Sequence, residues 1–209
     1  MRSILGFGTG IHKEQQKASS PLKVSYSEPN INEILTKQLY HIFSAVPAEQ
    51  EIILVCVGTD RSTGDSLGPL VGTNLNKLVD TDGVFLFGTL DHPVHAVNLR
   101  DTIHAIEQKH PNPFIVAIDA CLGQLSSVGI IQIGDGPVKP GAGVNKDLPS
   151  IGNMHVTGIV NVGGFMEYFV LQNTRLSLVM KMAEVIANAI YIALMNTRQA
   201  AVTPFLKLD

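Results

Sequence analysis

The sequence predicts an α/β protein with three α/β/α layers, in which helices cover both faces of a twisted, mainly parallel sheet. Four short apolar runs do not alternate with polar residues, which is typical of strands buried on both faces. Amphipathic stretches separate the first three runs, and this alternation is typical of right-handed crossovers between parallel strands. The chain has 209 residues, 45% hydrophobic and 16% charged, which suits one globular domain.

The chain divides into a lead-in and one domain. Residues 1–30 are polar and contain Ser and Pro, so we expect a loosely ordered segment before a single domain over 31–209. The domain is predicted to begin with a helix, because Asn30 and Glu33 form a capping pattern ahead of apolar residues on one helical face. Pro47 is expected to end this helix.

The remaining elements follow from the apolar pattern. Helical spacing predicts helices over 67–78 and 97–106, and a long helix from about 174 to 197. The pattern of 155–164 fits a strand or a helix. The last of the four apolar runs follows the third too closely for a crossover helix, so it is expected to be antiparallel or at an edge. The predicted strands are 52–57, 84–87, 114–118 and 128–133.

Composition argues against several partners and compartments. The net charge is −3, Trp is absent, and Lys and Arg form no run, so neither nucleic acid nor an anionic membrane is expected as a partner. The two cysteines, Cys56 and Cys121, suit a reducing compartment, and we expect a cytoplasmic protein.

The apolar stretch 176–195 is long enough to span a membrane, but it carries a polar stripe at helical spacing. Such a stripe is typical of a helix packed against another layer or against a partner subunit, so a homo-oligomer is one expectation. The stripe consists of Ser177, Lys181, Glu184 and Asn188.

Two aspartates follow predicted strands, where ligands of open α/β sheets collect. The loop 58–69 after the first strand lacks the Gly-Lys-Ser/Thr of a phosphate-binding loop but places Asp65 at a helix mouth, as a helix cap or a functional carboxylate. Asp119 directly follows the third strand, where a carboxylate needs amide partners, a second acid or a chemical role. Two such acids in a dry cleft share a proton and can activate water against an amide or ester.

Other polar residues near the strand ends are weaker candidates. Asp60 lies in the same loop as Asp65, and Cys121 follows Asp119 without a histidine tied to it by spacing. His155 is a lone histidine, more often structural than catalytic; beside the aspartates, its imidazole would instead complete a divalent metal site. The Gly- and Pro-rich segment 134–153 is long enough to be a lid, a binding loop or a disordered loop.

Several strings resemble known families. Residues 50–197, above all 58–69 and 163–177, resemble the sporulation protein YyaC family. The segments 55–58, 64–69 and 118–120 resemble the germination protease of spore-forming bacteria, although Gly64 stands where that family has Pro.

The resemblance implies a phosphorylase/hydrolase-like fold shared with the hydrogenase maturation endopeptidases. In the germination protease two aspartates are the proposed catalytic pair, and they match Asp65 and Asp119. In the maturation endopeptidases an acid, an aspartate and a histidine surround a metal, which implies Asp65, Asp119 and His155 here.

Three functions follow as hypotheses. The first is a peptidase without a cofactor, acting on a protein or peptide, such as small spore proteins, in the sporulating cell or spore interior. The second is a non-catalytic binding or regulatory sporulation protein that keeps the protease fold. The third is a metal-dependent hydrolase that uses the two aspartates and His155.

Overall fold

The computed structural model describes residues 20–79, 81–141 and 148–198. Six strands form one sheet in the order β1-β5-β6-β4-β2-β3. The strands are β1 (Leu22–Ser25), β2 (Ile52–Cys56), β3 (Val84–Phe87), β4 (Phe114–Gly123), β5 (Ile130–Asp135) and β6 (Met154–Val162). The helices are α1 (Ile31–Ser44), α2 (Leu67–Asn76), α3 (Leu99–Lys109), α4 (Glu167–Gln172) and α5 (Leu176–Arg198), with short 3-10 turns η1 (Gly64–Ser66) and η2 (Leu125–Ser127).

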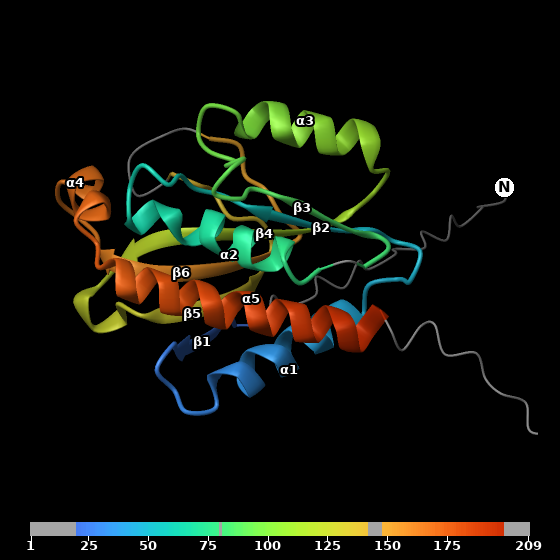
Figure 1. Cartoon of the computed structure of the whole chain (residues 1–209), viewed down its shortest axis with the longest axis horizontal. Helices are drawn as coiled ribbons and strands as arrows, with labels where there is room; N and C mark the ends of the chain where they lie inside the picture. Colours follow the sequence, from blue (N-terminus) through green and yellow to red (C-terminus); the bar gives the residue numbers. More distant parts are fainter. Residues whose placement is uncertain (1–19, 80, 142–147, 199–209) are drawn as a thin grey trace, which may run out of the picture.

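The predicted three-layer architecture is confirmed. Figure 1 shows α1, α2 and α5 on one face of the sheet and α3 on the other. Strands β6, β4, β2 and β3 run parallel to one another, whereas β5 runs antiparallel to both β1 and β6. The sheet is therefore mainly parallel with an antiparallel edge.

Two details of the strand prediction needed correction. Residues 154–162 are strand β6, which settles the ambiguity at 155–164. The segment 1–30, expected to be a loose lead-in, contains β1, which pairs with β5. Because β1 occupies the edge, β5 is an interior strand that is antiparallel, as expected, but not at the edge. Residues 1–19 of the lead-in lie outside the described residues.

The predicted position of the first helix is confirmed, but the predicted capping by Asn30 is not. It begins at Ile31 and ends at Ser44, before Pro47, while the Asn30 side chain makes no capping hydrogen bond. Burial of its apolar face against the sheet and α5 therefore holds this helix in place.

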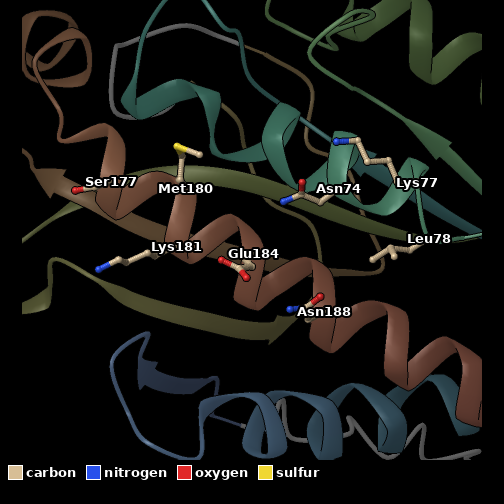
Figure 2. Close-up of a pocket in the computed structure, with 8 residues that line it drawn as sticks. All are labelled: Asn74, Lys77, Leu78, Ser177, Met180, Lys181, Glu184 and Asn188. Atoms are coloured by element: carbon tan, nitrogen blue, oxygen red, sulfur yellow. The ribbon is translucent and has the colours of Figure 1, made fainter.

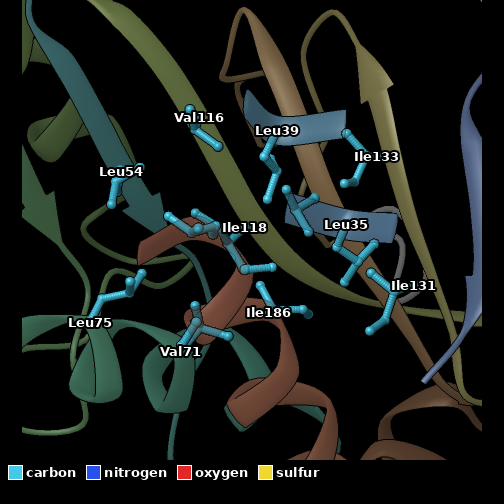
Figure 3. Packing of buried hydrophobic residues seen from close by; sticks show 14 of the residues in the cluster. Leu35, Leu39, Leu54, Val71, Leu75, Val116, Ile118, Ile131, Ile133 and Ile186 are labelled. Atoms are coloured by element: carbon cyan, nitrogen blue, oxygen red, sulfur yellow. The ribbon is translucent and has the colours of Figure 1, made fainter. Parts of the chain in front are cut away.

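The larger core lies between the sheet and the layer of α1, α2 and α5. Figure 3 shows side chains from these helices interdigitating with those of β2, β4 and β5. Ile118 and Leu54 on the sheet and Ile186 on α5 are at most 1% exposed. A smaller cluster fills the α3 face, where Ala117 packs with apolar residues of β2 and α3. Residues 115, 117, 119 and 121 of β4 thus face α3, because side chains alternate along a strand.

Helix α5 is the one described helix that is long and apolar enough to cross a membrane, and half of its most apolar window is buried in the protein. Its apolar side packs in the main core, against α1 and α2. Its polar stripe lines a groove of about 570 Å³ beside α2. Figure 2 shows the side chains of the stripe along α5, with Asn74 and Lys77 of the α2 side nearby. The stripe is thus the solvent side of a core helix, and association with a second subunit stays a prediction.

Candidate functional site

Asp119 lies inside a strand and not at its end. The prediction ended the third strand at Ile118, but β4 continues to Gly123 because its pairing with β6 continues past Asp119, which is opposite Thr157. The register shifts between Cys121 and Leu122. Irregular pairing of this kind is common next to active sites, where it redirects side chains.

Asp65 comes from the loop that follows β2. The backbone folds back so tightly that a Cβ on Gly58, whose φ is +145°, would lie 2.0 Å from the Asp65 carbonyl oxygen. The Thr59 N–H donates to the same carbonyl at 3.0 Å. Position 58 therefore requires glycine, and its close approach places Asp65 in η1, directly ahead of α2.

The two aspartates line one cavity of about 470 Å³ at the carboxyl end of β2 and β4. Its walls come from the 58–65 loop, from residues 138–141 and Leu148 of the long loop, and from α4. Residues 142–147 of the long loop lie outside the described residues. The 134–153 segment therefore includes wall residues of the cavity, and its role as a lid stays a prediction.

The electrostatics couple the two acids. Asp119 is 5% exposed, and burial raises the pKa of its carboxyl well above the ordinary value. The negative charge of Asp65 raises the same pKa further, because two nearby carboxylates cannot both ionise easily. The Ala120 N–H donates to Asp119 Oδ1 at 2.9 Å and opposes these effects only in part.

Cys121 lines the same cavity, and its surroundings disfavour the reactive thiolate form of its side chain. Burial and the charge of Asp119 raise its pKa from 9.0 to about 11, while a hydrogen bond with the Thr157 side chain lowers it. A nucleophilic cysteine needs the opposite, a lowered pKa and a neighbouring base. The surroundings therefore argue against Cys121 as a nucleophile.

Two other candidates lie away from the cavity. Asp60 is exposed and is not among the residues that line it. His155 is on the α3 face of the sheet, but in register with Ala117, two positions toward the amino end from the pair formed by Asp119 and Thr157. Its Nδ1 bonds to the Gly136 carbonyl at 3.0 Å, and its ring lies over Gly134.

The expected metal set does not come together. Within the described ranges, no three His, Cys, Asp or Glu side chains are close enough to hold a metal ion. Asp65 and Asp119 line one cavity, but the imidazole of His155 is turned to the loop after β5. The described residues therefore do not form the metal set of two acids and a histidine that the resemblance implies.

Sequence reasoning missed several cavity residues. Ser62, Lys139 and Tyr168 all line the cavity. His95, one of two histidines that the sequence places near the end of the second predicted strand, also lines it, just after a short parallel bridge between Val57 and Val94. The Gly-rich loop and the string 163–177 were noted in the sequence, but only the fold shows that both reach the same cavity.

Fold and cavity define the class: a three-layer α/β/α protein with a coupled pair of aspartates beside the carboxyl ends of its parallel strands. The chain belongs to the family described as a protein of unknown function, DUF1256, which matches residues 23–189. It is 55% identical over 175 residues to the uncharacterized protein YyaC of Bacillus subtilis (strain 168), which covers 82% of this chain and 85% of that protein. The predicted family is confirmed.

One solved structure is a distant neighbour. The NiFe hydrogenase maturation protease HycI from Thermococcus kodakarensis KOD1 aligns with a TM-score of 0.42 at 18% identity, covering 73% of this chain and 98% of that one. A likeness at this level carries no argument about activity.

Proposed function

We propose that the protein is a sporulation-associated peptidase in which Asp65 and Asp119 activate water for amide hydrolysis. The observation that carries the proposal is the carboxylate pair itself: both side chains line one cavity, and the charge of one acts on the pKa of the other. The substrate class is a protein or peptide, with small spore proteins as the first to test. The proposed location is the cytoplasm of the sporulating cell or the spore interior.

The environments of the two acids support different roles for them in this mechanism. Asp119 is the more buried and carries the raised pKa, so it holds the shared proton and donates it to the oxygen of the scissile carbonyl. Asp65 lies half-buried in the loop wall and accepts a proton from water as the water oxygen attacks the carbonyl carbon. Collapse of the tetrahedral intermediate returns a proton to Asp119, breaks the C–N bond and passes the proton on Asp65 to the leaving amine.

The cavity surroundings support a peptide as ligand. Apolar side chains such as Leu122, Leu148 and Leu171 line it beside the acids, and Tyr168 of α4 stands at its wall. Pockets that combine an apolar lining with a few convergent polar groups are typical of ligand sites.

The test is hydrolysis of a purified small acid-soluble spore protein, followed by mass spectrometry. We expect the wild type to cleave it, and Asp65→Asn and Asp119→Asn each to lose at least about 10³-fold in rate, because either change removes a proton carrier. Asp60→Asn is the matched control, since Asp60 is an exposed acid of the same loop outside the cavity.

Two results would contradict this mechanism. If Asp65→Asn and Asp119→Asn still turn over the substrate, the acid pair does not take part in the reaction. Activity lost on dialysis against a chelator and restored by a divalent cation would instead favour a metal-dependent hydrolase.

A non-catalytic binding or regulatory role is the second candidate, and the surface beside the cavity favours it. Phe165, Met166 and Phe169 are 81%, 57% and 55% exposed, which is unusual for neighbouring apolar side chains. A complex with a spore protein that forms without cleavage and is unaffected by Asp119→Asn would support this role. Loss of that complex on Phe165→Ser and Phe169→Ser would place the contact on this surface.

A further inference from the structure

The cavity contains a hydroxyl without a partner. Ser62 is 8% exposed and lines the cavity together with Asp65, three residues later in the same loop. Its Oγ is buried and has no hydrogen-bond partner among the described residues. Buried hydroxyls are nearly always bonded, since an unpaired one lowers stability. Ser62 is therefore a polar group that the fold itself leaves unsatisfied.

The loop holds Ser62 in place. The Gly58 N–H donates to the Val94 carbonyl at 2.8 Å, which fixes one end of the loop. At the other end, a Cβ on Gly64 would lie 2.8 Å from both Leu171 Cδ2 and Thr174 Oγ1, so the backbone is pressed against α4 and the residues after it. A hydroxyl on so constrained a backbone is preorganised for a ligand.

Neighbouring charges indicate what kind of atom Ser62 binds. Arg61 and Lys139 also line the cavity and favour ligand oxygen over a second cation. A serine hydroxyl can donate its hydrogen to such an oxygen, while the carboxylates can accept from an N–H group. One amide supplies both an acceptor and a donor.

We propose that Ser62 is a substrate-binding residue whose hydroxyl donates a hydrogen bond to a main-chain carbonyl of a peptide beside the aspartate pair. The proposal rests on the proposed function for the peptide character of the ligand. It adds to that function a specific contact that is made in the bound complex and missing in the free protein.

The first test needs no ligand. Ser62→Ala removes an unpaired buried hydroxyl, so we expect the melting temperature of the free protein to rise by about 2–4 °C. The matched control is Ser66→Ala in the same loop. Ser66 is 5% exposed, but its hydroxyl donates to the Thr63 carbonyl at 2.7 Å, so its loss is expected to lower the melting temperature.

The second test measures binding of the same spore protein by calorimetry, in an Asp119→Asn background that does not turn it over. Adding Ser62→Ala is expected to weaken binding about 3- to 10-fold, as for one lost hydrogen bond, whereas adding Ser66→Ala leaves it unchanged. In the active protein, Ser62→Ala is expected to raise KM more than it lowers kcat.

The outcomes separate this inference from the proposed function. Cleavage by the wild type with unchanged KM and affinity in Ser62→Ala would overturn the role of Ser62 and leave the peptidase standing. Binding without cleavage that Ser62→Ala weakens would overturn the peptidase and keep Ser62 as a binding residue. Absence of any binding, or a lower melting temperature for Ser62→Ala, would overturn the assignment of Ser62.

Discussion

The two ends of the parallel strands differ in how their buried charged groups are compensated. At the amino end, His110 is 7% exposed and bonds through Nδ1 to Glu51 Oε2 at 2.8 Å. Arg198, the last residue of α5, donates through its two terminal NH2 groups to the carbonyls of Ala48 and Gln50 at 2.8 Å each, while its Nε has no partner among the described residues. At the carboxyl end, Asp119 lies beside a second acid, and the Ser62 hydroxyl finds no partner in the described structure.

The contrast separates stability from function within one sheet. Paired polar groups at the amino end connect α5 and α3 to the residues at the start of β2. The acids at the carboxyl end raise the free energy of the folded state, an arrangement typical of sites that bind or react. Substitutions at the two ends should therefore change the free energy of unfolding in opposite directions.

The largest decrease in the free energy of unfolding is expected from Arg198→Ala. The change removes two charge-assisted hydrogen bonds from the segment between α1 and β2, and we expect about 1–3 kcal/mol lower stability in urea unfolding. Arg100→Ala, at an exposed site on α3, is the control and should change stability by less than about 0.5 kcal/mol. If Arg198→Ala and Arg100→Ala change stability equally, the hydrogen bonds of Arg198 do not stabilise the amino end.

A smaller loss is expected from Glu51→Gln. The Glu51 side chain is 32% exposed, so its hydrogen bond with His110 Nδ1 is partly screened by solvent, and we expect Glu51→Gln to lower the free energy of unfolding by about 1 kcal/mol. A double-mutant cycle with His110→Phe, which keeps a ring beside Phe85, should give a coupling of about 0.5–1 kcal/mol. Strictly additive effects would show that the pair does not stabilise this end.

Asp119→Asn is expected to change stability with the opposite sign. Because the folded-state pKa of Asp119 is raised above the ordinary 3.8, the folded protein binds more protons than the unfolded chain between those two values, and its stability falls as pH rises through that window. The asparagine side chain cannot ionise, so the stability of the Asp119→Asn variant does not fall in this pH window. The variant should therefore melt at a higher temperature than the wild type at pH 7, and the difference should vanish below about pH 4.

A melting temperature that falls equally at all pH values in Asp119→Asn would contradict the raised pKa. Asp135→Asn, at the exposed end of β5, provides a carboxylate control outside the cavity.

The sequence predicted those strands and helices whose apolar pattern lies within the element itself, and it missed those that depend on a partner distant in the chain. The apolar runs of β2 and β4 and the long α5 could be recognised because the apolar residues within each segment by themselves indicate a buried strand or helix. The polar Asp119 hid the second half of β4, since only the partner strand β6 shows that pairing continues. Four-residue β1 alternates apolar and polar residues from Leu22 to Ser25, but this short strand signal was missed in a segment interpreted as a lead-in, and only the pairing with β5 makes it clear.

The site divides in the same way. That Asp65 and Asp119 line one cavity could be predicted because each follows a recognisable apolar run, and parallel strands bring their carboxyl ends together. Ser62 could not, since no local pattern of the loop indicates that its side chain is buried and lines the same cavity as the acids. His155 was misleading for a similar reason: its Nδ1 bond to the Gly136 carbonyl lies in the loop after β5, which the sequence pattern does not place.

The smallest effect on folding is expected at Cys121, and it tests the coupling inside the cavity. With a pKa of about 11 against an ordinary 9.0, its thiol should react with iodoacetamide about 100-fold more slowly than a free cysteine at pH 8, because only the thiolate reacts. Part of that pKa comes from the charge of Asp119, so Asp119→Asn should speed alkylation wherever Asp119 is ionised in the wild type. The pH at which the two rates separate reports the ionisation of Asp119 independently of any substrate. Identical rates at every pH would show that the two groups do not interact.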